Sequence, residues 1–303
     1  MKIPMTQLLA SAVFLRSVAK RTAVHALWIA LLLAFSVLSS AALAQPLPPP
    51  PGYSASQLVF DDQFLLPALD STKWIPQIAD AFGIWRQSVP PPYSAPNSGS
   101  FSVAYFDPFP QQGSDTTGPH VVTGNGLRLI ATPSRMFKGY SWAGGVVCTH
   151  GLFYFTGGYV QFRAKMPDSR TGMWAALWFL EGGGEIDLQE SGFLLGSSNV
   201  NHVMAMNFHG NGGAQYLLDT GIDLSADYHV YGIEYIPGQS FRIYLDDVLM
   251  ATYTQNIPTG AYEILMDLEV AGSLATRWHT VAGPKTSNPG EFDVSEVQVY
   301  RLP

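Results

Sequence analysis

A two-residue hydrophobic period recurs along almost the whole chain, and it limits the fold more than any other feature of the sequence. In GGYVQFRAKMP, Val160, Phe162 and Ala164 share one face and alternate with polar or aromatic residues. That alternation is typical of a β-strand with one buried face. FRIYLDDVLMATY reads as two further strands around a hairpin turn at residues 246–247. No stretch after residue 52 sustains a helical period over three turns, so we predict an all-β sandwich or barrel.

The N-terminal 44 residues have the features of an export signal. Four basic and no acidic residues precede ALWIALLLAFSVLSSAALA, which ends in an A-x-A cleavage pattern at residues 42–44. We therefore predict a cleaved signal peptide over residues 1–44 and a secreted or periplasmic protein. An uncleaved membrane anchor is the alternative, because the apolar run is nearly long enough to span a bilayer. QPLPPPPG opens a stiff Pro-rich linker over residues 45–56, and we expect one domain over residues 57–303.

The charge balance excludes several classes of partner. Without the four basic residues of the signal, 12 Lys and Arg stand against 23 Asp and Glu, a net charge of about −11. This argues against nucleic acid and against an anionic membrane as partners, and we expect a monomer that contacts the membrane only through its export signal. Cys148 is the only cysteine, so the chain has no internal disulfide. The sequence has no zinc-binding Cys/His spacing, no P-loop and no dinucleotide-binding glycine motif.

Three carboxylates lie within six positions of GGGEIDLQESG, in a chain that is only 13% charged. Glu185 and Asp187 are two apart and share a face of a strand, whereas Glu190 faces the other way on a regular strand. One extra residue between Leu188 and Glu190 returns Glu190 to that face, which predicts a β-bulge; bulges are frequent beside active sites. Three acids on one face repel each other, so at least one keeps its proton to a raised pH. A glycosidase uses such a pair, one carboxylate ionised and one carboxyl protonated.

The segment EIDLQE resembles the E-[ILV]-D-x-x-E signature of glycoside hydrolase family 16. The resemblance covers residues 57–303 and rests on further motifs in the same order, LVFDDQF, GLFYFTGGYVQFRAKMP, GMWAALWFL, YHVYGIEYIPGQSFRIYLDDVLM and VSEVQVYR. It implies a concanavalin A-like jelly-roll sandwich of two curved antiparallel sheets, with a cleft on the concave face. It also implies hydrolysis of internal bonds in β-linked polysaccharides with retention of configuration.

The resemblance assigns roles to the three acids by position. Glu185 would be the nucleophile that forms a glycosyl-enzyme, and Glu190 the general acid that later acts as the base. Asp187 would hydrogen-bond the nucleophile and hold the charge pattern as protons move. A retaining mechanism needs the two catalytic carboxyl groups about 5–5.5 Å apart, so the bulged strand must bring them together.

Four further residues are expected to contact substrate. Trp178 matches a tryptophan of the family that stacks on the sugar, and His209 matches a histidine that lines the cleft. Trp174 shares a strand face with Trp178, with core packing as an equal alternative. Trp85 lies in a loop-rich region that would form a wall of the cleft.

We expect no metal or other cofactor. Many members of the family hold a structural calcium with a Glu of the opening strand and an Asp of the closing strand. Here those positions are Gln63 and Ser295, and the loss of both carboxylates removes much of the affinity for Ca²⁺. The segment MDLEVAGSLATRWHT also departs from the usual N-L-A-V-G-G-x-W, with Asp267 in place of Asn.

These observations predict a secreted, retaining endo-glycosidase that hydrolyses β-1,3- or mixed β-1,3/1,4-glucan. Cleavage of agar- or carrageenan-type galactans, and transglycosylation on the same fold, are the alternatives that the sequence leaves open. A lectin-like carbohydrate-binding module is the rival from another class, since lectins share the sandwich architecture. Such a module has no use for three converging acids.

Overall fold

The computed structural model describes residues 45–78, 89–90, 92–95, 101–109, 119–181, 184–210 and 213–303. The predicted signal peptide, residues 1–44, and the predicted site residue Trp85 lie outside the described residues. Within the described part of the chain, no helix combines the length and the apolar character that crossing a membrane requires. The regular structure consists of strands and short 3₁₀ helices, which confirms the all-β class that the period of two predicts.

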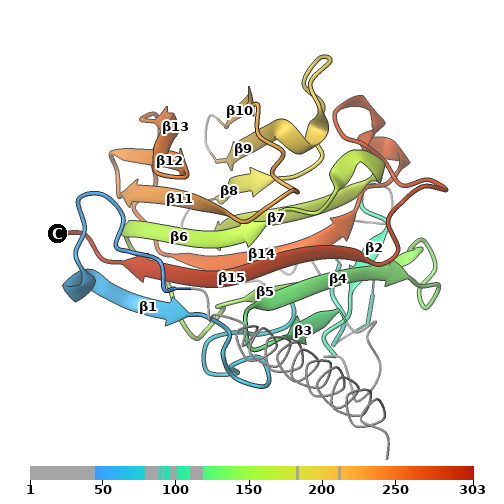
Figure 1. The fold of residues 1–303 in the computed structure, drawn as a ribbon, viewed down its shortest axis with the longest axis horizontal. Coiled ribbons are helices and arrows are strands. Elements are labelled where there is room, and N and C mark those ends of the chain that lie inside the picture. The colour runs from blue at the N-terminus through green and yellow to red at the C-terminus, as the bar shows by residue number, and fades with distance from the viewer. Residues whose placement is uncertain are drawn as a thin grey trace, which may run out of the picture. The chain divides into compact units, whose positions relative to one another are not determined.

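Two sheets make up the fold (Figure 1). In the first sheet the strands follow the order β10 (Ala214–Asp219), β9 (Val203–His209), β8 (Glu185–Glu190), β7 (Met173–Glu181), β14 (Tyr262–Val270) and β5 (Trp142–Cys148). In the second sheet the order is β13 (Val248–Tyr253), β12 (Ser240–Leu245), β11 (His229–Ile236), β6 (Gly158–Lys165), β15 (Gly290–Tyr300) and β4 (Leu127–Pro133). A short pairing between β4 and β5 joins the two sheets.

Three short strands and four 3₁₀ helices complete the described structure. Strand β1 (Leu58–Asp62) pairs with β15, β3 (His120–Val122) pairs with β4, and β2 (Ala104–Phe106) lies parallel to β5. The 3₁₀ helices are η1 (Ala55–Gln57), η3 (Ser169–Thr171), η4 (Val200–His202) and η5 (Ser273–Arg277). All the other strand pairs are antiparallel among the described residues.

The core lies between the two sheets. Alternate residues of β6, such as Val160 and Phe162, are fully buried together with alternate residues of β7, such as Leu177 and Phe179. The inward face of β7 is therefore its odd-numbered face, and Trp174 and Trp178 lie on the opposite face. We call that opposite face of the first sheet the site face.

The residues predicted as a Pro-rich linker pack against the second sheet. The backbone N–H of Leu47 donates to Glu296 Oε2 at 2.9 Å, and Gln161 Nε2 donates to the carbonyl of Pro48 at 3.0 Å. The ring of Tyr53 also contacts that of Tyr159. The residues predicted as a stiff, extended linker thus lie within the folded unit, which starts at Pro46, and they cover the polar side of β6.

Candidate active site

Strand β8 contains the bulge that the spacing of the three acids predicts. Its pairing with β7 moves from Asp187 to Gln189 while β7 advances by one residue. Its pairing with β9 moves from Asp187 to Glu190 while β9 advances by only two residues. One extra residue is thus absorbed between Asp187 and Glu190, and the side chain of Leu188 packs in the core.

The bulge brings the acids together on the site face. Asp187 and Glu190 each raise the pKa of a neighbouring acid through their charge, and the charge of Glu185 raises the pKa of both. Acids this close cannot all ionise as readily as isolated carboxyls. The side chain of Glu185 is 23% exposed, whereas Asp187 and Glu190 are buried.

Neutral donors fix the carboxyl group of Glu190. Trp174 Nε1 donates to Glu190 Oε1 at 3.0 Å, and Asn207 Nδ2 donates to Glu190 Oε2. Asn207 is itself oriented by Gln215, whose Nε2 donates to Asn207 Oδ1 at 2.7 Å. Asn207 lies two residues before His209 in β9, on the same face, so the period of two could have identified it.

The three acids differ in how strongly their surroundings favour the protonated form. Burial raises the pKa of Glu190 well above its usual range, and the neighbouring charge of Asp187 raises it further. Burial also raises the pKa of Asp187 well above its usual range. Burial raises the pKa of Glu185 above its usual value, and the charge of His209 offsets part of this rise. Glu190 is therefore suited to hold a proton, and Glu185, beside a histidine and open to solvent, is suited to carry a negative charge.

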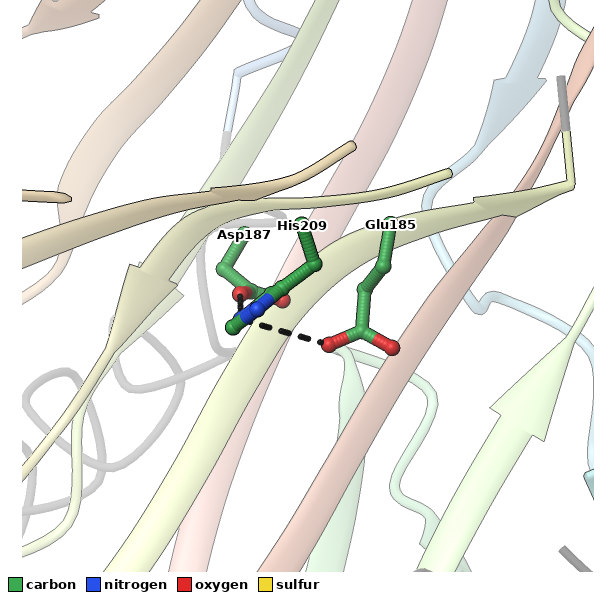
Figure 2. Close-up of side chains that lie close together, drawn as sticks. All are labelled: Glu185, Asp187 and His209. Atoms are coloured by element: carbon green, nitrogen blue, oxygen red, sulfur yellow. Dashed lines mark ion pairs between the residues drawn. The ribbon is translucent and has the colours of Figure 1, made fainter. Parts of the chain in front are cut away.

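His209 lies between Asp187 and Glu185 and forms an ion pair with each (Figure 2). Its Nε2 lies 3.1 Å from Asp187 Oδ2 and 3.6 Å from Glu185 Oε1, and its side chain is 59% exposed. The donor atoms of the three residues lie within 4.8 Å of one another. One nitrogen and two carboxylate oxygens suit zinc rather than calcium. A metal ion at this position would occupy the carboxylate of Glu185, the one exposed carboxylate of the site. The ion pairs with His209 already explain why the three side chains lie close together, so we assign no metal to this group.

The two predicted tryptophans lie on the same face of β7 and make different contacts. Trp174 packs against Trp278, His279 and Phe193 and donates its indole N–H to Glu190. These contacts give it a positioning role toward the acid. Trp178 is 5% exposed and donates its indole N–H to Asp267 Oδ1 at 2.6 Å. The predicted contacts of both rings with a sugar stay predictions.

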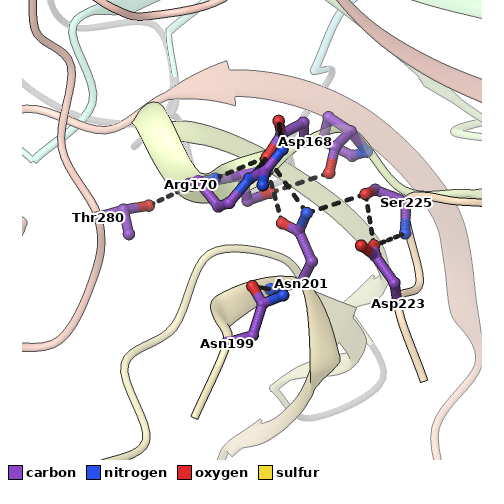
Figure 3. A network of polar contacts seen from close by, with 9 residues as sticks. Asp168, Arg170, Asn199, Asn201, Asp223, Ser225 and Thr280 are labelled. Atoms are coloured by element: carbon purple, nitrogen blue, oxygen red, sulfur yellow. Dashed lines mark hydrogen bonds and ion pairs between the residues drawn. The ribbon is translucent and has the colours of Figure 1, made fainter. Parts of the chain in front are cut away.

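A polar network lies behind the turn that follows Glu190. Figure 3 shows Asn201 between Asp168 and Ser225, and its Nδ2 donates to both. Asn201 Oδ1 accepts the backbone N–H of Ser169, whose hydroxyl donates to Ser191 Oγ at 2.8 Å. The network therefore anchors the residue next to Glu190 to the loop that precedes β7.

Two buried acids of β14 were not among the predicted site residues. Asp267 and Glu269 are 1% and 8% exposed, and they lie on the site face opposite residues of β7. Burial raises the pKa of each well above its usual range, and the charge of Asp267 raises that of Glu269 further. The spacing of two in MDLE places both acids on one face, and this signal in the sequence could have found the pair.

This acid pair has an expected effect on stability. A carboxyl whose pKa is raised in the folded state binds more protons there than in the unfolded chain, so the free energy of unfolding falls as the pH rises through the folded pKa. Asp267→Asn keeps the acceptor for Trp178 and removes one ionisable group. We expect its Tm at pH 7 to exceed that of the unsubstituted protein by at least about 3 °C, and the two to converge near pH 3.

Thermal melts followed by circular dichroism between pH 3 and pH 8 measure the effect. Asp227→Asn is the matched control, because Asp227 is exposed and the bond that it accepts from the N–H of Tyr228 survives the change. An Asp267→Asn protein that melts below the unsubstituted protein at pH 7 would contradict the expectation.

Gln63 and Ser295, the positions at which the resemblance implies calcium ligands, make other contacts. Ser295 Oγ accepts from Arg163 Nε at 2.7 Å, and the same guanidinium pairs with Glu296 at 2.7 Å. Gln63 Nε2 donates to Asp61 Oδ2 at 3.3 Å. Arg163 thus brings a fixed positive charge to Ser295, which disfavours a second cation there.

We therefore expect EDTA to change the Tm by less than about 1 °C. Calorimetric scans with EDTA, with added CaCl₂ and with neither test this expectation directly. A fall of several degrees with EDTA that CaCl₂ reverses would show that a calcium site exists despite Gln63 and Ser295.

Comparisons with known proteins bear on the family and the fold. The sequence model described as Glycosyl hydrolases family 16 matches residues 112–290. The endo-1,3-1,4-β-glycanase EglC of Rhizobium meliloti (strain 1021) is 26% identical over 239 residues, which cover 73% of this chain and 48% of EglC. The endo-1,3-1,4-β-glycanase ExsH of the same organism is 25% identical over 201 residues, which cover 62% of this chain and 40% of ExsH. The chain thus spans about half the length of these curated relatives or less.

A solved structure confirms the fold. The laminarinase catalytic domain of Thermotoga maritima MSB8 superposes with a TM-score of 0.62 at 22% identity, covering 82% of this chain and 98% of that domain. This likeness confirms the jelly-roll sandwich.

Proposed function

Because the chain belongs to glycosyl hydrolases family 16, we propose that it is a secreted, retaining endo-glycosidase that hydrolyses β-1,3- or mixed β-1,3/1,4-linked glucan. The observation that carries this proposal is the bulge in β8, which returns Glu190 to the face that holds Glu185 and Asp187. Without the bulge, Glu190 would point into the core and the site would lack its acid.

The surroundings of the acids divide the roles between them. Glu185 carries the charge, attacks the anomeric carbon and forms a glycosyl-enzyme as the glycosidic C–O bond breaks. Glu190, which burial keeps protonated, gives its proton to the departing oxygen. In the second step the ionised Glu190 takes a proton from water, and the resulting hydroxide attacks the anomeric carbon and releases Glu185. Asp187 lies between the two acids in β8, and its charge raises the pKa of Glu190.

His209 supports the ionised form of Glu185. Its imidazole lies within 3.6 Å of Glu185 and within 3.1 Å of Asp187, so a protonated ring stabilises both carboxylates. It is also the most exposed of these three side chains, which allows it to contact a sugar hydroxyl.

The substrate class follows from what the relatives are called. Two are described as endo-1,3-1,4-β-glycanases and a structural neighbour as a laminarinase. Release of reducing ends from laminarin, lichenan, agarose and κ-carrageenan, with sizing of the products, is the test. We expect oligosaccharides from laminarin or lichenan, with the β-anomer seen first by proton NMR.

Each other outcome selects a different function. Products from agarose or κ-carrageenan alone would replace the glucan proposal by the galactan alternative. Products longer than the starting oligosaccharide would indicate transglycosylation. Binding to a polysaccharide without any turnover would favour the lectin-like alternative and overturn the enzyme.

Export is the remaining part of the proposal, and it rests on residues 1–44. Expression of the full chain in a bacterial host should place the mature protein outside the cytoplasm, with Gln45 as its N-terminal residue. Recovery of the full-length chain in the membrane fraction would support the uncleaved anchor instead.

A further inference from the structure

The bulge interrupts the hydrogen bonding between β8 and β9. Asp187 pairs with Asn207, and the next pair is Glu190 with Ala205. Two residues of β8, Leu188 and Gln189, therefore face one residue of β9, Met206, and the regular exchange of backbone hydrogen bonds is broken over this stretch. Ala205 and Val203 are buried, so water does not reach the polar groups of β9 there. Some other group must satisfy them, because buried backbone groups are rarely left without a partner.

The side chain of Gln189 fills the gap in the pairing. It is fully buried, its Oε1 accepts the backbone N–H of Ala205 at 3.1 Å, and its Nε2 donates to the carbonyl of Val203 at 3.3 Å. The same Nε2 donates to the carbonyl of Glu190 at 3.3 Å. The amide of this side chain thus takes the place of a peptide group, giving β9 both the acceptor and the donor that the bulge withdraws.

We propose that Gln189 is a positioning residue for Glu190: it locks the bulge and so keeps the carboxyl group of Glu190 on the site face. This inference rests on the proposed role of Glu190 as the general acid. Its physical basis is the alternation of a strand, in which a shift of one residue turns every following side chain to the other face. If the bulge relaxes toward regular pairing, Glu190 turns away from Asp187 and Asn207 and the acid is lost.

Gln189 acts on one side of the bulge, and Ser191 acts on the other. Ser191 exchanges hydrogen bonds with β7: its Oγ accepts the N–H of Ala175, and its N–H donates to the carbonyl of Ala175, both at 2.9 Å. Those bonds hold the chain after Glu190 to β7 and do not reach β9. The contact of the Gln189 amide with Ala205 and Val203 adds to the pairing of Glu190 with Ala205, and it needs both an acceptor and a donor on one side chain.

The test compares two substrates that differ in their need for an acid. Laminaritetraose has a poor leaving group and needs protonation, whereas 2,4-dinitrophenyl β-laminaribioside has a leaving group that departs without it. The quantity measured is kcat/KM, which covers the steps up to formation of the glycosyl-enzyme. For Gln189→Leu we expect a fall of about 10–100-fold on laminaritetraose and of less than about 3-fold on the aryl glycoside.

Controls separate positioning from general damage to the fold. Gln161→Leu removes an equally buried amide of the second sheet, which donates to Pro48 and Gln298. It should change kcat/KM on both substrates by the same factor. Gln189→Glu is the second variant in case Gln189→Leu does not fold: it keeps an acceptor for Ala205 and loses the donor for Val203. We expect the same selective loss on laminaritetraose for this variant.

The outcomes decide between the inference and the proposed function. An equal loss on both substrates, or no loss on either, in the soluble Gln189 variants would overturn the role of Gln189. Glu190→Gln is measured beside them. If Glu190→Gln shows no selective loss on laminaritetraose, the proposed function of Glu190 fails. If Glu190→Gln shows this selective loss and the Gln189 variants do not show it, only the inference about Gln189 fails.

Discussion

Glu185→Gln is expected to lower kcat on laminarin by at least about 10⁴-fold while leaving the fold and the Tm unchanged. The amide has the shape of the carboxylate but cannot form the glycosyl-enzyme. Glu185 is partly exposed and lies beside His209, so its replacement removes no core contact. Initial rates of reducing-end release measure the loss, and Glu291→Gln, a change at an exposed acid of β15, is the matched control.

A stereochemical measurement sharpens this prediction. In Glu185→Ala the space of the carboxylate can admit azide, which then attacks a β-linked substrate directly. A single displacement inverts the anomeric carbon, so the product should be the α-glycosyl azide. Substantial turnover of Glu185→Gln without added nucleophile would show that another group is the nucleophile.

Glu190→Gln has the second largest expected effect. We expect kcat/KM on laminaritetraose to fall by roughly 10²–10⁴-fold, the range that general acid catalysis supplies. The introduced amide can still accept the indole N–H of Trp174, so the loss is chemical rather than structural. The azide product of Glu190→Ala should be the β-glycosyl azide, because Glu185 still acts first and two inversions restore the configuration.

The dependence of activity on pH tests the same assignment of roles to Glu185 and Glu190. In the unsubstituted protein, activity should fall at low pH as Glu185 gains a proton and fall at high pH as Glu190 loses one. Burial raises the pKa of Glu190 well above its usual range, so the high-pH limb should lie well above the range of ordinary carboxyls. Glu190→Gln should abolish that limb and keep the low-pH limb. A variant whose residual activity still falls along the original high-pH limb would assign the acid to another residue.

Much of the site could be predicted from the sequence because the three acids lie on one strand. A period of two assigns residues to faces, and an odd spacing between acids that must meet requires a bulge. The same local reasoning identified the hairpin turn at Asp246 and Asp247, where the structure has positive φ angles of 48° and 64°. Such turns depend on a few adjacent residues, so they can be recognised without knowledge of the rest of the fold.

The local period could not show which strands bring the partners of the acids beside them. Asn207 comes from β9 and Asp267 from β14, which is far from β8 in sequence and is separated from it in the sheet only by β7. Strand order depends on the packing of the whole sandwich, which the period does not encode. Composition also could not show that part of residues 45–56 packs against the second sheet, because a Pro-rich segment has the same local conformation whether it links two parts or packs against a sheet.

The sequence by itself determined the all-β class, the face on which each carboxylate lies and the need for a bulge, because these follow from backbone geometry over a few residues. Only the tertiary structure decided that Gln189 bridges the bulge, that Trp174 and Asn207 hold Glu190, and that Asp267 and Glu269 of β14 lie on the site face beside β7. It also decided which carboxyls are buried and therefore have raised pKa values. The pKa of a buried carboxyl depends on the desolvation and the charges that all its neighbours impose, and those neighbours are assembled only when distant strands pair.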